Sequence, residues 1–368
     1  MLFRNYQFKS LNFRLIIYVL ALTIIGILII GSANADSQKK QILGLVLGII
    51  VMFIMALVDF EYILNFHWLI YFGTIAMLAM VLKFGHGSHG ARRWLQIGIT
   101  FQPSELAKIL LVLFMAWFLS KYQHVLNTEK MLAITALLCA IPLLLILKEP
   151  DTSTTIVTFM VLFTMICCAG LTRKIVIPFF SITVPAFFMY ILFVYNTGNA
   201  LIPGYQAERI LSWLHPEDYP QKAFQQTNSI MAIGSGMLFG KGLYNDSTAS
   251  VKNGNYIPEP QTDFIFAVAG EELGFIGSAI IIILTLLISY ECLKTARKAY
   301  TLSGTLICIG IACIVSYQSF VNVCVVTGLM PNTGLTLPFV SYGLTSLMTL
   351  YLGIGIVLNV SLQEKRYR

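Results

Sequence analysis

The run Leu15-Ile-Ile-Tyr-Val-Leu-Ala-Leu-Thr-Ile-Ile-Gly-Ile-Leu-Ile-Ile30 contains no charged residue. Apolar runs of this kind recur along the chain, near residues 13–33, 41–59, 63–83, 104–121, 131–148, 152–170, 174–195, 263–289, 302–327 and 338–361. A helix needs roughly 20 mostly apolar residues to cross a bilayer. The sequence therefore predicts an all-α integral membrane protein with about ten transmembrane helices, which form one polytopic domain over residues 1–368.

The composition argues against a soluble protein. Of the 368 residues, 57% are hydrophobic and 11% are charged, whereas a soluble domain is about 25% charged. The outer residues of a soluble fold face water, so a soluble chain of this size could not cover so much apolar surface. The seven cysteines lie in or beside apolar runs and form no C-x-x-C pair, which indicates neither disulfides nor a zinc site.

Charged residues predict the orientation of the chain. If both termini and every second loop are cytoplasmic, that side carries thirteen basic and five acidic residues, against eleven and twelve on the other side. Cytoplasmic loops of membrane proteins carry an excess of Lys and Arg. We therefore expect both termini in the cytoplasm, and the net charge of +7 reflects orientation and not binding to nucleic acid.

The first apolar run has an alternative interpretation. Three basic residues precede it, and it ends in Ala33-Asn34-Ala35, which resembles a signal-peptidase site. Cleavage there would leave nine spans and an outer N-terminus. The run is long for the apolar region of a signal peptide, which favours a membrane span.

Two long segments fall on the outer side. The larger one, about 197–262, contains several prolines, so we expect it to begin as irregular chain. Residues 229–242 within it are apolar, contain four glycines and are too short to span, which is typical of an interfacial or re-entrant element. The second outer segment is about 85–103. Loops this long are usually functional.

Asp263 opens the eighth run and has two interpretations. Asp is a good N-cap residue, and a carboxylate suits the positive end of a helix dipole. An ionisable group at the mouth of a span also commonly faces a cavity. Glu271 and Glu272 follow eight and nine residues later, so a continuous helix would place them roughly 12–13 Å deeper.

Other polar residues also stand at span mouths. Glu105 and Lys108 share a helix face and form either a self-neutralising pair or part of the Asp263 cavity, with Lys108 keeping the carboxylate ionised. The trio of Arg92, Arg93 and Trp94 suits either an interface anchor or a phosphate beside a sugar.

Gly270 and Gly274 are spaced for close helix packing. Helix breakers at 331–343 accompany Thr336, Ser341 and Tyr342, which is typical of a cavity lining. The sequence has no Walker loop, H-E-x-x-H or G-x-S-x-G motif.

Several strings resemble the SEDS family, the RodA, FtsW and SpoVE proteins of bacterial wall synthesis. They are Ala91-Arg-Arg-Trp94, Phe101-Gln-Pro-Ser-Glu-Leu-Ala-Lys108, Ala232-Ile-Gly-Ser-Gly236, Gly240-Lys-Gly242, Ile257-Pro-Glu-Pro-Gln-Thr-Asp-Phe-Ile-Phe-Ala267, Gly270-Glu-Glu-Leu-Gly274 and Leu337-Pro-Phe-Val-Ser-Tyr-Gly343. They cover essentially the whole chain in the family's order. The resemblance implies ten spans, cytoplasmic termini and a large outer loop between the seventh and eighth.

The resemblance also implies a peptidoglycan glycosyltransferase in the bacterial cytoplasmic membrane. Such proteins polymerise lipid II, a disaccharide-pentapeptide on undecaprenyl pyrophosphate, together with a class B penicillin-binding protein and other elongation or division proteins. The family's essential aspartate matches Asp263, its outer-loop tryptophan matches Trp94, and its acid–base pair matches Glu105 and Lys108.

The chain departs from the family pattern at two places. Gln261 replaces a frequent His, which argues against a catalytic role at that position, and Leu344-Thr345 replaces the usual second Gly and Ser and alters the packing of the last span. The short termini and Gly240-Lys-Gly242 favour RodA, whereas Thr333-Gly-Leu-Thr-Leu-Pro338 favours FtsW and SpoVE. We expect an elongation-type RodA.

The implied reaction assigns roles to the remaining candidates. Asp263 would be the general base for the hydroxyl of an acceptor sugar. Arg92, Arg93, Lys241 or a bound Mg²⁺ or Mn²⁺ would stabilise the leaving pyrophosphate, and Asp263 with Glu259 would hold such a metal ion. Ser341 would line the cavity.

Two other functions fit the same composition. A lipid II flippase would also have many spans and broken helices, but it would concentrate polar groups near the midplane, whereas here they cluster at the outer end. A scaffold would use its outer loops and apolar span faces mainly to bind partners.

Overall fold

The computed structural model describes residues 6–86, 93–97, 99–198, 205–244, 250, 254 and 256–363. The helices are α1 (Phe13–Ala33), α2 (Ala35–Leu57), α3 (Phe60–Leu64), α4 (His67–Phe84), α5 (Pro103–Lys121), α6 (Glu129–Lys148), α7 (Thr152–Cys168), α8 (Arg173–Thr197), α9 (Tyr205–Leu214), α10 (Pro220–Ser235), α11 (Ile265–Lys298), α12 (Leu302–Val326) and α13 (Leu344–Leu362). Two 3₁₀ turns, η1 (Phe8–Ser10) and η2 (Gln123–Val125), and a hairpin of β1 (Leu95–Ile97) and β2 (Ile99–Phe101) complete the described elements.

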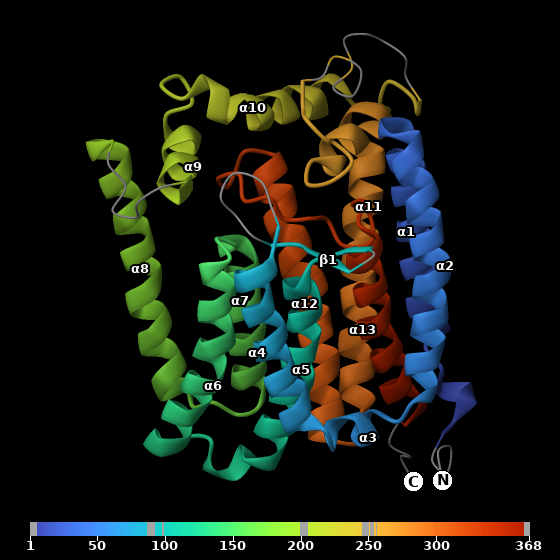
Figure 1. Ribbon diagram of the computed structural model, residues 1–368, viewed down its shortest axis with the longest axis vertical. Coiled ribbons are helices and arrows are strands. Elements are labelled where there is room, and N and C mark those ends of the chain that lie inside the picture. The colour runs from blue at the N-terminus through green and yellow to red at the C-terminus, as the bar shows by residue number, and fades with distance from the viewer. Residues whose placement is uncertain are drawn as a thin grey trace.

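The expected membrane fold is confirmed. In the described ranges, nine helices are long and apolar enough to cross a membrane. The 17-residue α7 is a shorter apolar helix, with a length of about 26 Å at 1.5 Å per residue. Figure 1 shows these helices standing side by side as one bundle.

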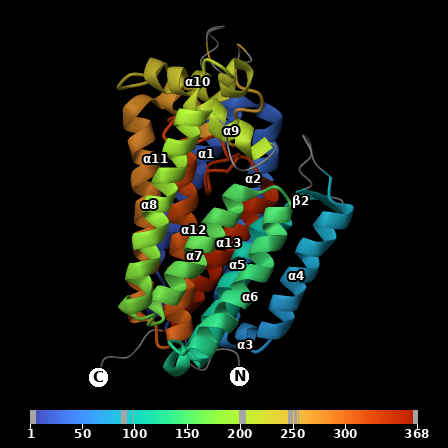
Figure 2. The same ribbon diagram turned by 90° about the vertical axis from the view of Figure 1, so that its left-hand side faces the viewer.

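The bundle has a central layer and an edge. About three quarters of the apolar window is buried in α5 (78%), α12 (72%) and α13 (72%), whereas none is buried in α8. Small residues allow close contacts between α2 and α13: Gly48 of α2 lies against the Tyr351 ring of α13, and Gly355 of α13 lies against Met52 of α2. Small residues let two helix backbones approach closely in a membrane protein. Figure 1 places α8 at the margin of the bundle, and Figure 2, seen from that side, shows α8 in front.

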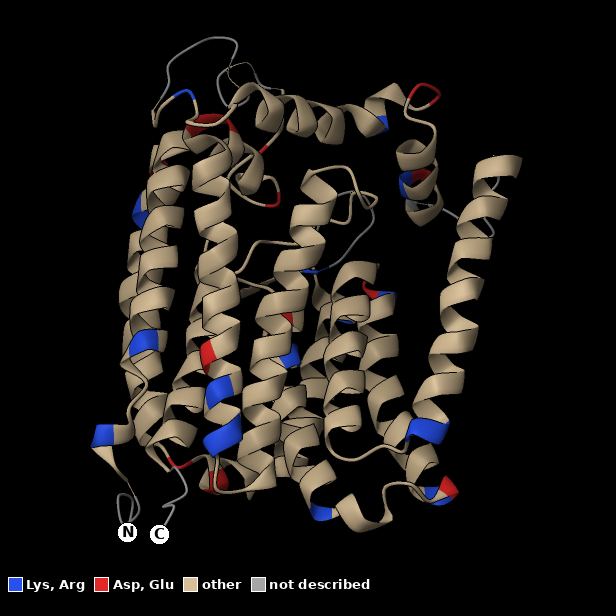
Figure 3. Ribbon diagram, turned by 180° about the vertical axis from the view of Figure 1, so that it is seen from behind, with Lys and Arg blue, Asp and Glu red and all other residues tan. Residues whose placement is uncertain are grey.

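The described chain begins and ends at the same end of the bundle. The amide of Gln7 donates to the carbonyl oxygen of Leu362 across 2.9 Å. Lys and Arg residues gather toward this end (Figure 3). An even number of crossings therefore fits the described helices.

Two predicted boundaries differ from the structure. The second helix begins at Ala35 and not near 41, because the Asn34 side chain accepts a hydrogen bond from the Ser37 amide and caps α2 directly after α1. The third run is divided into α3 and α4, and Asp59 caps α3 through the amide of Glu61.

The start of the large outer segment is helical where it is described, so the prediction of irregular chain was wrong for α9 and α10. Pro216 lies beyond the end of α9, and Pro220 begins α10, where a missing amide proton costs no hydrogen bond. Figure 1 shows α10 lying crosswise over the end of the bundle. The following turn leaves Met237 80% and Phe239 77% exposed, which supports an interfacial element.

The expected continuous eighth span is interrupted at Gly274, whose φ of 67° and ψ of −162° are not helical. Only residues 275–298, about 36 Å long, then form one straight helix. The Ser32 hydroxyl, at the outer end of α1, donates to Glu272 across 2.6 Å. This contact places Glu272 at the outer end of α1 and not deeper in the bundle, so the expected depth of roughly 12–13 Å was wrong for Glu272.

Candidate active site

Asp263 lies in the loop just before α11, and a hydrogen bond to its backbone carbonyl group holds it in place. Its carbonyl oxygen accepts a hydrogen bond of 2.8 Å from the side-chain amide of Asn322 in α12. The same amide donates to the carbonyl oxygen of Leu335 across 2.6 Å. Gly334 adopts a φ of 71°, and a β-carbon built there would lie 3.2 Å from Asp263 Oδ2. One asparagine thus joins the Asp263 loop to the broken segment at 331–343.

Ser341 holds the other side of the same loop. Its hydroxyl donates to the carbonyl oxygen of Thr262 across 2.7 Å and accepts from the Leu337 amide across 2.8 Å. The amide of Tyr342 donates to the carbonyl oxygen of Gln261 across 2.9 Å. Ser341 is buried, so the structure gives it a role in positioning the loop beside Asp263, where the sequence suggested a cavity lining.

Opposing influences set the pKa of Asp263. Burial of the carboxyl group raises its pKa to about 6, although the positive charges of Arg209 and Arg93 lower it, and the negative charges of Asp151 and Glu259 raise it further. The carboxyl group is therefore mostly ionised at pH 7. The residue as a whole is half-buried, which leaves it open to a substrate.

Arg93 precedes β1, and its side chain is held by backbone and side-chain acceptors just before the start of α7. Its guanidinium group donates to the carbonyl oxygens of Glu149 (3.4 Å) and Pro150, and its Nη1 lies 4.0 Å from Asp151 Oδ1. Asp151 caps α7 by accepting from the Thr154 amide across 3.2 Å. The charge of Arg93 thus acts on Asp263, whereas its role at the pyrophosphate stays a prediction. Arg92 lies outside the described residues.

Two charged residues that act on Asp263, Asp151 and Arg209, were missed from the sequence, and so was Glu149 beside Asp151. The signal for the two acids was Glu149-Pro-Asp151, a pair of acids between two apolar runs. Burial raises the pKa of Glu149 to about 8, and neither carboxyl oxygen has a hydrogen-bond partner, so this group is mostly neutral at pH 7. Arg209 gave no local signal, because only the packing of α9 brings it toward the Asp263 loop.

Glu105 and Lys108 form a buried brace. Lys108 is 2% exposed; its ammonium group donates to Glu105 across 2.9 Å and to the Gln318 side chain across 2.6 Å. Gln318 in turn donates to the Thr336 carbonyl oxygen across 3.1 Å. The pair thus connects α5 to α12 and to the segment at 331–343. The carboxylate that Lys108 pairs with is that of Glu105.

The remaining candidates occupy separate places. Trp94 is 38% exposed and pairs with His86 through two backbone hydrogen bonds, just before the β1–β2 hairpin. Lys241 forms an ion pair of 2.7 Å with Glu271. Both residues line a cavity of about 300 Å³ between α10 and α11. Because Glu271 neutralises Lys241 there, Arg209 is the better-placed second cation at Asp263.

The described residues do not form a protein-only metal centre. Within those ranges, no three His, Cys, Asp or Glu side chains are placed to hold a metal ion. Glu259 is exposed on a turn with a φ of 49°, and its carbonyl oxygen accepts from the amide and hydroxyl of Thr262. The expected Mg²⁺ or Mn²⁺ site on Asp263 and Glu259 has no third such ligand among these residues.

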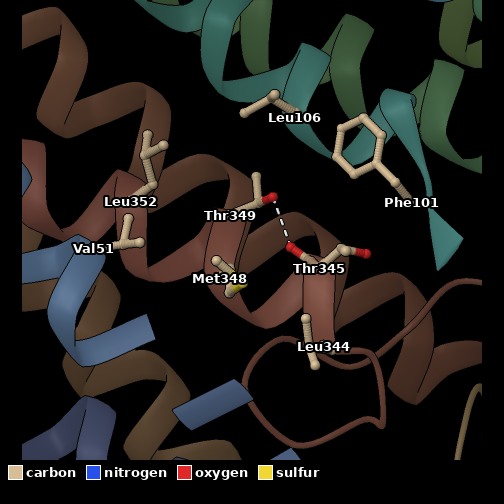
Figure 4. Close-up of a pocket in the computed structure, with 8 residues that line it drawn as sticks. All are labelled: Val51, Phe101, Leu106, Leu344, Thr345, Met348, Thr349 and Leu352. Carbon is tan, nitrogen blue, oxygen red and sulfur yellow. Dashed lines mark hydrogen bonds between the residues drawn. The ribbon is translucent and has the colours of Figure 1, made fainter. Parts of the chain in front are cut away.

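An apolar groove of about 380 Å³ lies between α13, α2, and the junction of β2 with α5. Figure 4 shows Phe101 and Leu106 on one side and residues of α13 on the other. Two of the residues that depart from the family pattern, Leu344 and Thr345, line it. The expected change in packing of the last span therefore falls on this groove.

A family model described as a cell cycle protein, covering FtsW, RodA and SpoVE, matches residues 8–366. The chain belongs to this family, the SEDS family. It is 35% identical to the stage V sporulation protein E of Bacillus subtilis, over 94% of this chain and 96% of that protein. It is 33% identical to the peptidoglycan glycosyltransferase MrdB of Escherichia coli, over 95% and 93%.

A solved structure on the structural coordination of polymerization and crosslinking by a peptidoglycan synthase complex contains a chain of the same fold. Its TM-score is 0.77 at 29% identity, with coverage of 95% of this chain and 97% of that one. The SEDS resemblance is thus confirmed. Relatives from different branches match almost equally well, so the assignment to RodA stays a prediction.

Proposed function

We propose that this SEDS protein polymerises lipid II into glycan strands on the outer face of the bacterial cytoplasmic membrane. The observation that carries the proposal is the half-buried Asp263 carboxylate, whose loop is fixed by Asn322 and Ser341 and whose charge is balanced by Arg93 and Arg209. The name of the Escherichia coli relative, peptidoglycan glycosyltransferase, supports the same class of reaction.

In this mechanism, Asp263 is the general base. The 4-hydroxyl group of the acceptor sugar attacks the anomeric carbon of the donor and transfers its proton to the carboxylate. The bond from that carbon to the pyrophosphate oxygen breaks, and undecaprenyl pyrophosphate leaves with inversion at the carbon. A base with a pKa of about 6 is suited to this step, because it is mostly ionised near pH 7 and still accepts a proton.

The leaving group gains negative charge as the bond breaks. Arg93 and Arg209 are placed to stabilise it, because both act electrostatically on the Asp263 site. Arg93 enters this role preorganised, since the carbonyl oxygens of Glu149 and Pro150 hold its guanidinium group. Pyrophosphate is a good leaving group, so one carboxylate and these cations suffice for the step.

The apolar groove is suited to the polyprenyl chain. It is lined almost entirely by apolar atoms from four elements (Figure 4). Leu344, which lines the groove, is two residues after Tyr342. The amide of Tyr342 donates to the carbonyl oxygen of Gln261, two residues before Asp263. This continuity would place the tail in the groove and the pyrophosphate at the carboxylate.

The chain would work within a synthase complex that includes a cross-linking class B penicillin-binding protein. The solved complex with a similar chain couples polymerization and crosslinking, which supports this partnership. Both termini would be cytoplasmic, because the described chain ends meet at the end where Lys and Arg gather (Figure 3). Asp263 would then face the outer leaflet.

The test is polymerisation of labelled lipid II by the purified protein with its cognate partner, whose own chemistry is blocked. Asp263→Asn should lower the rate by about a hundredfold or more, because a general base typically contributes 10²–10⁴. A matched control is Asp36→Asn, since Asp36 is exposed at the start of α2. Wild-type rates from a folded, partner-bound Asp263→Asn protein would refute the assignment.

A further inference from the structure

A basic pocket lies at the opposite end of the molecule from Asp263, where the described chain begins and ends. It has a volume of about 300 Å³ and is formed by residues 9–14, before and at the start of α1, and by the last turns of α11. Its charged lining residues are Lys9, Arg14, Lys294, Lys298 and Glu291. Among the described lining residues, cationic side chains thus outnumber carboxylates.

The pocket is a built junction between two distant parts of the chain. Asn12 donates through its side-chain amide to Glu291 Oε2 across 3.0 Å and to the Thr295 hydroxyl across 3.2 Å. Its side-chain oxygen accepts from the Leu15 amide and caps α1. Lys294 lies 3.5 Å from Glu291. Glu291, the one carboxylate among the described lining residues, is therefore already bonded to Asn12 and paired with Lys294.

An apolar surface adjoins this charged pocket. Phe13 and Ile17, one turn apart on α1, are 62% and 60% exposed, and Leu293 on α11 is 43% exposed. In a membrane-spanning bundle such side chains face acyl chains. The pocket thus presents cations at the level of the headgroups directly beside a surface that suits lipid tails.

We propose that this pocket binds the phosphate headgroup of an anionic phospholipid, with the acyl chains along the exposed faces of α1 and α11. Basic pockets between membrane helices on the cytoplasmic side are known to take anionic headgroups. A volume of about 300 Å³ is that of roughly ten water molecules in the liquid, which leaves room for a small headgroup. Bound lipid would clamp α1 to α11 at the end remote from the Ser32–Glu272 contact.

The chain offers a matched pair of variants. Arg14→Gln with Lys294→Gln removes one Arg and one Lys from the pocket. Arg173→Gln with Lys174→Gln removes the same two charges from the start of α8, at the same end of the bundle but on exposed positions outside the pocket. Neither pair includes a residue placed at the Asp263 site.

The first measurement is native mass spectrometry of the full chain with phosphatidylglycerol against phosphatidylcholine. Wild type should retain the anionic lipid, and the pocket variant should lose about thirtyfold in affinity, because each cation near a membrane surface contributes about fivefold. The Arg173/Lys174 variant should change less than twofold. Equal losses in the two variants, or equal retention of the two lipids by wild type, would overturn the proposal.

A second measurement separates the lipid from free phosphate and does not depend on the variants. Phosphatidylglycerol should raise the unfolding temperature of the wild-type protein in detergent, and the increase should shrink as NaCl rises. Inorganic phosphate at the same concentration should give little stabilisation, because it cannot use the apolar faces. Equal stabilisation by inorganic phosphate would replace the lipid with a soluble anion and refute this proposal.

Discussion

Burial first, and then charges from separate segments of the sequence, set the pKa of Asp263. Burial raises the pKa to about 6, while Arg209 on α9 and Arg93 before β1 lower it. A carboxylate acts as a base only when it is deprotonated, so activity should fall as the pH drops through about 6. The pH–rate profile of polymerisation should therefore have an acid limb near that value.

Arg209→Gln tests the same balance with a definite sign. The Arg209 charge lowers the pKa of Asp263, so its removal should raise that pKa and move the acid limb to higher pH, by up to about one unit. The measurement is the rate of lipid II polymerisation between pH 5 and 8. Arg173→Gln, at the far end of the bundle, is the control and should leave the midpoint unchanged. A midpoint that stayed fixed or fell in Arg209→Gln would contradict this account.

At this scale the sequence could predict some site residues and not others. Asp263, Glu105 and Lys108 stand at span mouths, where charge is costly and therefore conspicuous. Arg209 lies in a polar outer segment, where an arginine is ordinary. The hydrogen bonds of Ser341 to the Thr262 carbonyl and of Asn322 to the Asp263 carbonyl join residues 79 and 59 positions apart, so only the folded chain reveals them.

Among the elements, α11 depends on one backbone conformation. Gly274 has a φ of 67°, and a β-carbon there would meet the backbone of Leu238 and Gly240. Gly274→Ala should therefore destabilise the protein by about 2 kcal/mol or more, through strain and collision together. Gly73→Ala is the matched control, because Gly73 lies within α4 and nothing would contact its β-carbon within 4 Å.

The readout for this pair is the apparent unfolding temperature in detergent, together with polymerisation activity. Gly73→Ala should be neutral or slightly stabilising, since alanine favours helix over glycine by 0.5–1 kcal/mol. Gly274→Ala should lower both stability and activity, because the break positions the residues on either side of it. Similar unfolding temperatures for the two variants would show that the break is not required.

The brace between α5, α12 and the broken segment makes a separate prediction. Lys108→Ala would leave Glu105 buried with Ser346 as its described hydrogen-bond partner, which should cost about 3–5 kcal/mol. Glu105→Gln combined with Lys108→Met removes both charges and should recover much of that loss. If the pair only positions the 331–343 segment, activity should return with stability. Activity that stays lost in a stable double variant would indicate direct contact with substrate.

Element boundaries show why prediction stops where it does. Long apolar runs identified the spanning helices, because a bilayer imposes length and composition on them. The interruption at Gly274 was hidden, since glycine spacing alone equally indicated helix packing. Gly270 does pack closely against Ile233 of α10, as predicted, whereas Gly274 breaks the helix at a kink. Apolar content could not distinguish these two uses of glycine.

For the molecule as a whole, charge asymmetry and apolar content predicted one polytopic bundle whose two chain ends lie together. What they could not supply is the groove, because it forms where α2, α5 and α13 meet, far apart in sequence. Leu344 and Thr345 were noticed only as departures from the family pattern, yet both line the groove (Figure 4). The shape of this groove should therefore determine how the polyprenyl tail is accommodated.

Met348→Trp would fill part of the groove without touching the Asp263 loop. Lipid tails are as apolar as leucine, so the groove selects by packing and shape more than by transfer from water. We expect the KM for full-length lipid II to rise roughly threefold to tenfold, about 1 kcal/mol, with kcat nearly unchanged. A lipid II analogue with a short prenyl chain should be affected less, because it fills less of the groove. Leu286→Trp is the control for an added aromatic ring in the membrane, because Leu286 of α11 is 59% exposed. An equal rise in KM for both tail lengths, or for both variants, would place the tail elsewhere on the bundle.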